Sequence, residues 1–301
     1  MLAEWGESER RLTDRVSVLM GAGNGAYPSA NSLLVRGSSE SILIDPSIAV
    51  VALGGAPVKV DAILNSHGHE DHVAGNGLFK NARVHVHEAD LVGIQSLDGL
   101  MSIYGFEGAV REGFKKVVTE EFFFEPRPDA QGFSDGQVFE LGGMNVEAVH
   151  LPGHTRGHSG FRISDRVFFL SDIDLTGFGP YYGDAWSDLE DFESSLRRVR
   201  DEEADYYVTS HHKGVIEGRD AFLEKLDAFA SVIDRRHSAM LEFLAEPRSV
   251  DEMVSHRFIY RPHVKAAFAD AVERRSADLH LQRMLRRGEV REAEPGRFEC
   301  I

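Results

Sequence analysis

Residues 64–76 read LNSHGHEDHVAGN, and this stretch places three histidines and two acids within six consecutive positions. Each of these side chains is costly to bury unless a partner compensates it. His67 and His69 are two residues apart, so on an extended segment their side chains point the same way. Asp71 and His72 follow where a glycine-flanked loop gives way to an expected helix, so they can approach from another side. The pattern can therefore supply two ligands to each of two adjacent metal ions.

Other segments of the chain carry donors of the same kind at the ends of expected strands. LPGHTRGHSG supplies His154, FLSDIDL supplies Asp172, and TSHHKG supplies His211 or His212. Proteins of the α/β class usually place their chemistry in such loops at strand ends. A closed metal site needs more ligands than the first cluster provides, and these segments offer them.

Composition limits the classes of partner. The 301 residues include 42% hydrophobic and 27% charged residues, ordinary values for a globular protein with a sizeable core. Lysine and arginine number 33 against 49 acids, and the net charge of −16 disfavours electrostatic binding to nucleic acid or to an anionic membrane. We therefore expect a small-molecule substrate, no nucleic-acid partner and no membrane. The composition leaves open whether the chain forms oligomers.

Three further features predict a cytoplasmic protein. No apolar run is long enough for a membrane helix. The N-terminal segment MLAEWGESERRL lacks the apolar core of a secretory signal. The single cysteine, Cys300, excludes an internal disulfide and fits a reducing cytosol.

A change in residue pattern along the sequence predicts two domains. Short β-branched runs alternate with glycine-rich turns in the first two-thirds, and residues 91–132 form an irregular, partly helical insertion that could cover a site as a lid. From Asp220 apolar residues recur at helical spacing. Further along, SVDE has the form of a capping box, and a last helix with a glycine stop leads to a short β-wing. We therefore expect a catalytic domain in residues 1–218 and a C-terminal helical domain in residues 219–301. The strands are expected at residues 41–47, 60–67, 82–88, 145–153, 166–172 and 205–211.

The sequence resembles the metallo-β-lactamase superfamily. The matching pieces are SHGHEDH, LPGHTRGHSG, FLSD and TSHHKGVI, which occur in the family's order over residues 67–216. This resemblance implies an α/β (α+β) fold, a four-layer αββα sandwich with the metals at one edge between the sheets. The tail ADLHLQRMLRRGEVREAEPGRFE resembles the small winged-helix appendage of some relatives. It predicts a winged-helix-like C-terminal domain, which we interpret as a packing module because its charge from Arg261 onward is only +2.

The resemblance also implies a set of metal ligands. One metal would be held by His67, His69 and His154, and the second by Asp71, His72 and a terminal histidine, with Asp172 bridging. An ungapped match to the family's last motif selects His212, whereas the end of the strand selects His211, which we favour. Serine replaces the commoner glycine before Asp172, which keeps the carboxylate but alters the backbone freedom.

These ligands predict the cofactor and the reaction. Imidazoles and carboxylates suit zinc, although manganese and iron accept similar sets, so we expect two divalent ions, most simply zinc. A metal-bound hydroxide, available near neutral pH, would attack an electrophilic carbonyl or phosphorus centre. Asp71 could orient this nucleophile.

Residues near the motifs carry further expectations. The aromatic segment LTGFGPYYGDAW follows Asp172, and Tyr181 or Tyr182 could donate to a developing oxyanion. His158 is expected to hold the loop of His154 by a hydrogen bond. Glu70 occupies a variable position in the motif and is expected to be exposed.

Two further groups are expected to lie away from the chemistry. His85 and His87 share a strand face and are interpreted as surface residues. The phenylalanines of EFFFEP, at positions 122–124, could form an apolar lid or a plug in the core.

We conclude from the sequence that the chain is a dinuclear metal-dependent hydrolase of a small ester, thioester or lactone. The first alternative is a phosphodiesterase or single-strand endoribonuclease with the same metal site. Two lesser alternatives are a mononuclear iron dioxygenase of a sulfur substrate and a metal-binding regulatory module.

Overall fold

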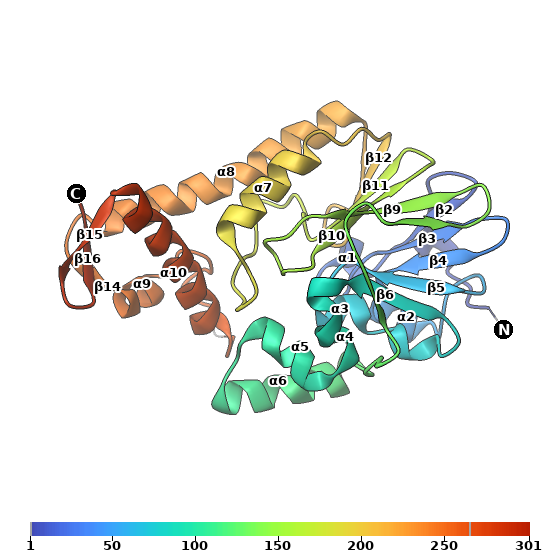
Figure 1. Ribbon diagram of the computed structural model, residues 1–301, viewed down its shortest axis with the longest axis horizontal. Coiled ribbons are helices and arrows are strands. Elements are labelled where there is room, and N and C mark those ends of the chain that lie inside the picture. The colour runs from blue at the N-terminus through green and yellow to red at the C-terminus, as the bar shows by residue number, and fades with distance from the viewer. Residues whose placement is uncertain (1, 265) are drawn as a thin grey trace.

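The computed structural model describes residues 2–264 and 266–301, which form two packed β-sheets flanked by helices and a C-terminal extension (Figure 1). The first sheet has the strand order β1-β2-β3-β4-β5-β6-β7, and the second has the order β13-β12-β11-β10-β9-β8. The strands of the first sheet are β1 (Glu9–Arg11), β2 (Val16–Leu19), β3 (Ser32–Arg36), β4 (Ser41–Ile44), β5 (Ala62–Asn65), β6 (Arg83–His87) and β7 (Gln131–Phe133). Those of the second are β8 (Val138–Glu140), β9 (Asn145–His150), β10 (Ser159–Ile163), β11 (Val167–Ser171), β12 (Tyr206–Thr209) and β13 (Val215–Glu217).

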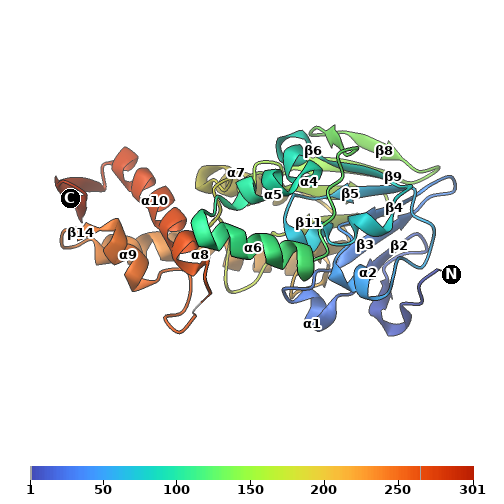
Figure 2. The ribbon, with the colours of Figure 1, turned by 90° about the horizontal axis from the view of Figure 1, so that it is seen from below.

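Helices cover the outer faces of both sheets (Figure 2). The short helices α1 (Ala22–Gly25), α2 (Ile48–Ala52) and α3 (Glu70–Val73) follow strands of the first sheet. The expected insertion is helical, with α4 (Leu91–Gln95), α5 (Leu97–Tyr104) and α6 (Gly108–Glu120). On the second sheet lie α7 (Leu189–Val199) and the long α8 (Arg219–Phe243).

The strands are apolar on both faces because both faces of each sheet are covered. In β4, Ile42 and Ile44 lie in the cluster between the two sheets, whereas Leu43 packs with the helices outside. In β11, Phe169 faces the other sheet and Phe168 faces α7 and α8. Alternate residues of a strand point to opposite faces, so this division creates three apolar layers between four layers of secondary structure. The αββα sandwich expected from the sequence is confirmed.

The strand directions bring the sequence motifs to one edge of the sandwich. β4, β5 and β6 are parallel to one another. β9 and β11 are each antiparallel to β10, and β12 is parallel to β11, so these three strands also share a direction. The residues that follow β5, β9, β11 and β12 therefore reach the same edge.

The C-terminal segment consists of helices and a small sheet. α8 continues into β14 (Arg248–Ser249), α9 (Val250–His256), α10 (Ala269–Arg287), β15 (Val290–Glu294) and β16 (Arg297–Cys300). The expected capping box is present at Ser249 and Glu252, and Gly288 ends α10 in the left-handed conformation. The three strands form one antiparallel sheet in the order β14-β16-β15. The winged-helix arrangement itself stays a prediction.

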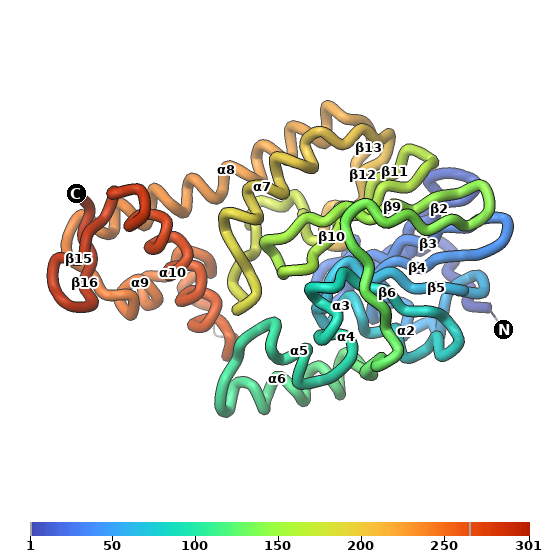
Figure 3. Tube along the Cα trace, in the orientation of Figure 1, coloured from blue at the N-terminus to red at the C-terminus, as the bar shows by residue number. Residues whose placement is uncertain are grey.

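The expected boundary at residue 218 falls at the start of α8, a helix that belongs to two clusters. Phe222, Leu226 and Phe229, in its first half, pack on the second sheet and α7. Met240, in its second half, packs with α9 and α10 in a separate core. The division into domains stays a prediction, because α8 takes part in both cores. Phe268, just before α10, also stacks with Phe106 of the insertion at 6.4 Å between ring centroids. The start of α10 accordingly lies beside the insertion in the trace (Figure 3). Among the described residues, no helix has the length and apolar character that crossing a membrane requires.

The three consecutive phenylalanines of EFFFEP give a matched test of the core. Phe124 is buried in the cluster beneath α4, α5 and α6, whereas Phe123 is 52% exposed. We expect Phe124→Ala to lower the free energy of unfolding by about 3–5 kcal/mol, because it removes a buried ring and leaves a cavity. Phe123→Ala should change it by less than about 0.5 kcal/mol. Urea unfolding followed by circular dichroism measures both, and equal effects would contradict this assignment of the core.

Candidate metal centre

The first group of donors consists of His67, His69 and His154. His67 and His69 follow β5, and His154 lies in the turn after β9. One ring nitrogen of each lies within 4.8 Å of the others, and all three side chains are buried. Nδ1 of His69 lies 3.0 Å from Nε2 of His154. Nε2 of His67 is buried and has no hydrogen-bond partner among the described residues. Three nitrogens therefore converge on one point.

The second group consists of Asp71, His72 and His211. The first turn of α3 carries Asp71 and His72, and His211 follows β12. Oδ2 of Asp71 lies 3.2 Å from Nε2 of His211, and its Oδ1 lies 3.6 Å from Nε2 of His72. His212, the other candidate for the last position, is exposed and belongs to neither group. The structure thus brings His211 to the cluster, as the end of the strand suggested.

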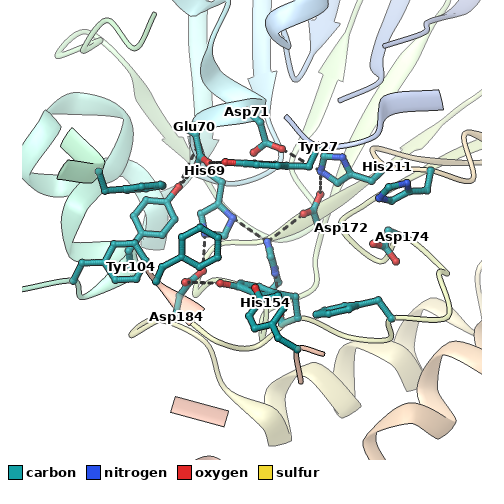
Figure 4. Close-up of a pocket in the computed structure, with 17 residues that line it drawn as sticks. Tyr27, His69, Glu70, Asp71, Tyr104, His154, Asp172, Asp174, Asp184 and His211 are labelled. Carbon is teal, nitrogen blue, oxygen red and sulfur yellow. Dashed lines mark hydrogen bonds and ion pairs between the residues drawn. The ribbon is translucent and has the colours of Figure 1, made fainter. Parts of the chain in front are cut away.

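Asp172 lies between the two groups. Its Oδ1 is 3.1 Å from Nε2 of His72 and 3.6 Å from Nε2 of His211. Its Oδ2 is 3.3 Å from Nε2 of His154. One carboxylate oxygen therefore faces each group, which is the arrangement a bridging ligand needs (Figure 4).

The serine before Asp172 has a visible consequence. Ser171 adopts a φ of 52°, in the left-handed region that glycine occupies at little cost. Its hydroxyl lies 2.7 Å from the hydroxyl of Ser66, which precedes His67. The substitution of the family's commoner glycine therefore adds a contact between two of the turns that carry donors.

The two groups differ in their electrostatics. Burial acts to lower the pKa of His72, but the carboxylates around it outweigh burial and raise the pKa well above its usual value. The same balance raises the pKa of His211 to about 9. In His67 and His154 of the first group burial dominates instead: it lowers the pKa of His154 to about 4 and that of His67 well below the usual value. In His69 burial also acts to lower the pKa, but the carboxylate of Asp184 outweighs it and raises the pKa.

These charges fit divalent cations. The neutral imidazoles of His67 and His154 are ready to coordinate, and the acid-rich second group attracts positive charge. Nε2 of His67, Nε2 of His72 and Oδ1 of Asp172 are buried without a well-aligned hydrogen bond to any described residue. Buried polar atoms of this kind are expensive unless something compensates them. Two cations would satisfy all of them.

Residues outside the two groups hold the donors in place, as metal-ligating histidines usually require. Nδ1 of His154 contacts the carbonyl oxygen of Tyr181 at 3.0 Å, and Nδ1 of His211 contacts that of Gly25 at 2.7 Å. His158 behaves as expected. Its Nδ1 donates to the carbonyl oxygen of Leu151, and its Nε2 accepts from the backbone N–H of Asp172. Burial lowers the pKa of His158 to about 3, so the ring is neutral and can play both parts.

Sequence reasoning missed Asp45, which holds the His-x-His turn and α3 together. Asp45 is fully buried and directly follows β4. It accepts hydrogen bonds from the backbone N–H and the hydroxyl of Ser66, and its Oδ2 lies 2.9 Å from Nδ1 of His72. An acid directly after a buried strand was the available signal.

Asp90 was missed as well, and it joins two of the turns that carry donors. It accepts from the N–H groups of Gly68 and Gly157 and from the hydroxyl of Thr155. Its place in a polar stretch of sequence gave no such signal.

Three expectations about neighbouring residues are corrected. Glu70 is buried, not exposed, and accepts hydrogen bonds from the hydroxyls of Tyr27 and Tyr104. Tyr182, expected as an oxyanion donor, is 1% exposed, and its hydroxyl contacts Nε2 of His280 at 2.9 Å. It faces the C-terminal helices because Pro180 and the neighbouring glycines turn the loop.

His85 and His87 are buried rather than on the surface. The ring of His87 stacks on that of His150 at a centroid distance of 3.9 Å. The second sheet covers the face that they share, with Phe139 of β8 against His85 and His150 of β9 against His87, and neither histidine belongs to a donor group.

A cavity of about 360 Å³ opens beside the two groups (Figure 4). Tyr181 lines it, but its hydroxyl donates to Oδ1 of Asp184 at 3.1 Å. Asp174 also lines it, with Oδ1 accepting from the N–H of Thr176, and belongs to neither donor group. Among the described residues, neither lysine nor arginine lines the cavity. Its aromatic lining comes from the loop after α1, the insertion, the loop after β11 and the C-terminal segment: Tyr27, Tyr104, Phe106, Phe114, Phe178, Tyr181, Tyr260 and Phe268.

A family profile described as the metallo-beta-lactamase superfamily matches residues 28–211, which include every donor named above. The chain belongs to this superfamily. The matched range ends before α8, so α8, α9 and α10 lie outside it.

Two solved structures share the fold over nearly the whole chain. A metallo-beta-lactamase family protein from Thermus thermophilus superposes with a TM-score of 0.72 and 22% identity, covering 97% of this chain and 100% of its own. A beta-lactamase domain protein from Burkholderia ambifaria gives a TM-score of 0.69 at 17% identity, covering 100% of this chain and 95% of its own.

Curated relatives match a smaller part of the chain, at identities of 23–29%. An uncharacterised protein of Mycobacterium tuberculosis is 28% identical over 153 residues, which cover 48% of this chain and 64% of that protein. An atrochrysone carboxyl ACP thioesterase of Pseudocercospora fijiensis is 23% identical over 80% of this chain and 64% of its own length. A hydroxyacylglutathione hydrolase of Haemophilus influenzae is 29% identical over 50% of this chain and 69% of its own. The chain thus spans about 64% of the length of the first curated relatives that it matches.

The adjacent histidines at the end of β12 give a direct test of the second group. We expect the wild-type chain to bind two divalent cations, and His211→Ala to bind one, because the variant removes one of three donors. His212→Ala is the matched control and should retain both. Elemental analysis after dialysis against zinc measures the stoichiometry. Loss of a metal in the His212 variant alone would reverse the assignment.

Proposed function

We propose that this protein is a dinuclear metal-dependent hydrolase that acts on a small ester, thioester or lactone. One observation carries the proposal: two three-donor groups lie on either side of Asp172, whose two oxygens face one group each. A single structural ion would need only one such group. A mononuclear iron site would likewise leave the second group without a purpose.

The donor set defines the chemistry. Two divalent ions held there would supply a nucleophile ionised near neutral pH and stabilise charge on the reacting carbonyl oxygen. His67, His69 and His154 would hold one ion, and Asp71, His72 and His211 the other, with Asp172 between them. Zinc suits these ligands best, and manganese and iron accept similar sets.

Asp71 has a second part in this proposal. It lines the cavity as well as belonging to the second group. Its carboxylate can therefore accept a hydrogen bond from the attacking water and orient it toward the substrate. Tyr181 serves in the wall of the cavity, since its hydroxyl proton is directed to Asp184.

The walls of the cavity favour an uncharged acyl group. They combine aromatic rings with carboxylates, and no described lysine or arginine is present to bind an anion. A phosphodiester or an RNA strand would bring negative charge to an acidic surface, so we rank this alternative second. Two of the relatives are an atrochrysone carboxyl ACP thioesterase and a hydroxyacylglutathione hydrolase, which agrees with carbonyl chemistry here.

Chelation and reconstitution test the metal dependence. We expect a chelator to abolish hydrolysis and added zinc or manganese to restore it, because the nucleophile depends on the ions. Asp172→Ala should lower kcat/KM by at least about 100-fold and should not recover at higher metal concentration, since several kcal/mol of transition-state stabilisation depend on both ions. Unchanged turnover in this variant would refute the dinuclear site.

A chromogenic panel tests the substrate class. It contains acyl thioesters, aryl esters, lactones and bis-nitrophenyl phosphate, each assayed with the reconstituted protein. We expect turnover of at least one carbonyl substrate with an uncharged acyl group and little or none of the phosphodiester. Turnover of the phosphodiester alone would select the alternative function.

A further inference from the structure

A four-residue turn after the aromatic segment, residues 184–187, contacts two donors of the first group. Oδ2 of Asp184 lies 3.0 Å from Nε2 of His69. The hydroxyl of Ser187 donates to the carbonyl oxygen of His154 at 2.7 Å and accepts from the N–H of Asp184 at 3.2 Å. Both turn residues are buried. The turn therefore contacts the ring of His69 through a carboxylate (Figure 4) and the backbone of His154 through a hydroxyl.

The carboxylate of Asp184 determines which nitrogen of His69 remains available. Nδ1 of His69 faces Nε2 of His154, on the side where the three donors converge. Nε2 points the other way, toward Asp184, and neither it nor Oδ2 of Asp184 has another partner among the described residues. A carboxylate on the distal nitrogen keeps the proton there and orients the ring, which strengthens binding at the other nitrogen.

Because Asp184 is buried, its contact with His69 matters for the position of the ring. Asp184 is fully buried, and a buried carboxylate is costly unless it is paired. Its described side-chain contacts are the hydroxyl of Tyr181 on Oδ1 and the ring of His69 on Oδ2. Removing the carboxylate would free the imidazole to rotate away from the first group.

The same turn is held from the other side by the C-terminal helix α10. Nε of Arg275 donates to the carbonyl oxygen of Asp184 at 3.1 Å, and a terminal nitrogen donates to that of Ser187 at 2.6 Å. Gly183 packs so closely on Val272 that an added Cβ would lie 2.3 Å from a methyl carbon of that residue. The turn is therefore fixed between the donors and a helix outside the range that the family profile matches.

We propose that Asp184 is a positioning residue for His69 and that α10, through Arg275, holds the turn that presents it. The C-terminal segment would then set the affinity of the first metal site, in addition to lining the cavity. This inference rests on the proposed function only in requiring a metal at His67, His69 and His154.

Zinc-binding isotherms of the full-length, chelator-stripped protein test the inference, with a chromophoric chelator as competitor. Asp184→Ala is expected to weaken one of the two binding steps by about 10- to 100-fold, the usual cost of losing such a partner. Asp184→Asn retains an acceptor of the same shape and should lose less. The step that His211→Ala removes identifies the second group, and the weakened step should be the other one.

Two adjacent arginines of α10 provide matched variants. Arg275→Ala should weaken the same step as Asp184→Ala, and by less, because it loosens the turn without removing the carboxylate. Arg274 forms an exposed ion pair with Asp251 and does not contact the turn, so Arg274→Ala should bind zinc as the wild type does.

Three results would overturn the inference. The first is wild-type affinity for both ions in Asp184→Ala and Arg275→Ala. The second is equal weakening of both steps in Asp184→Asn, which would show a general disturbance of the site. The third is an effect of Arg274→Ala as large as that of Arg275→Ala. A wild-type chain that binds two zinc ions but hydrolyses no substrate would refute the proposed function and leave the inference standing.

Discussion

The burial of many imidazole and carboxylate groups in one place is the constraint on which this structure depends. Each such group loses its hydration, and no described lysine or arginine lies in the cavity to compensate the acids. The fold meets this cost partly with its own contacts. Asp45 and Asp90 accept hydrogen bonds from the turns that carry the donors, and His158 fixes the backbone of Asp172. Nε2 of His67, Nε2 of His72 and Oδ1 of Asp172 stay without a well-aligned hydrogen bond to a described residue where the donors converge, and cations bound there would meet this part of the cost.

Local patterns in the sequence predicted most of the fold and the donors. The strand at residues 41–47 is apolar on both faces, and it proved to lie between two layers. The residues of the His-x-His-x-Asp-His pattern lie in the two donor groups, and such short-range spacing can be read from the sequence because strand and helix geometry operate over a few residues. Contacts between distant segments left no such pattern. Asp45 contacts His72, which lies 27 positions further along the chain, and Glu70 contacts Tyr104, 34 positions further along. The sequence therefore did not indicate that the carboxylates of Asp45 and Glu70 are buried. The prediction that Tyr182 donates to an oxyanion was wrong for a related reason. The direction of a side chain in a loop depends on the helices packed against it, and here the hydroxyl contacts His280 of α10.

The C-terminal segment is more closely tied to the site than its weak charge suggested. Arg236 of α8 donates to the carbonyl oxygens of Phe178 and Pro180, and Arg275 of α10 holds the following turn. Tyr260 and Phe268 complete the aromatic wall. The segment from Phe178 to Ser187 therefore has the donors on one side and the C-terminal helices on the other. Packing of this kind makes the two parts of the chain interdependent even though the family profile matches only the first.

The origin of the cavity wall has a consequence for how this protein can diverge. The donors follow β5, β9, β11 and β12, whereas the aromatic rings come largely from the insertion, the loop after β11 and the C-terminal segment. The residues that hold the metals and the residues that shape the cavity thus come from largely separate segments of the sequence. Substitutions among the aromatic residues can change which substrate the cavity admits while the donor residues stay the same. Homologues can therefore differ in substrate and still share one reaction.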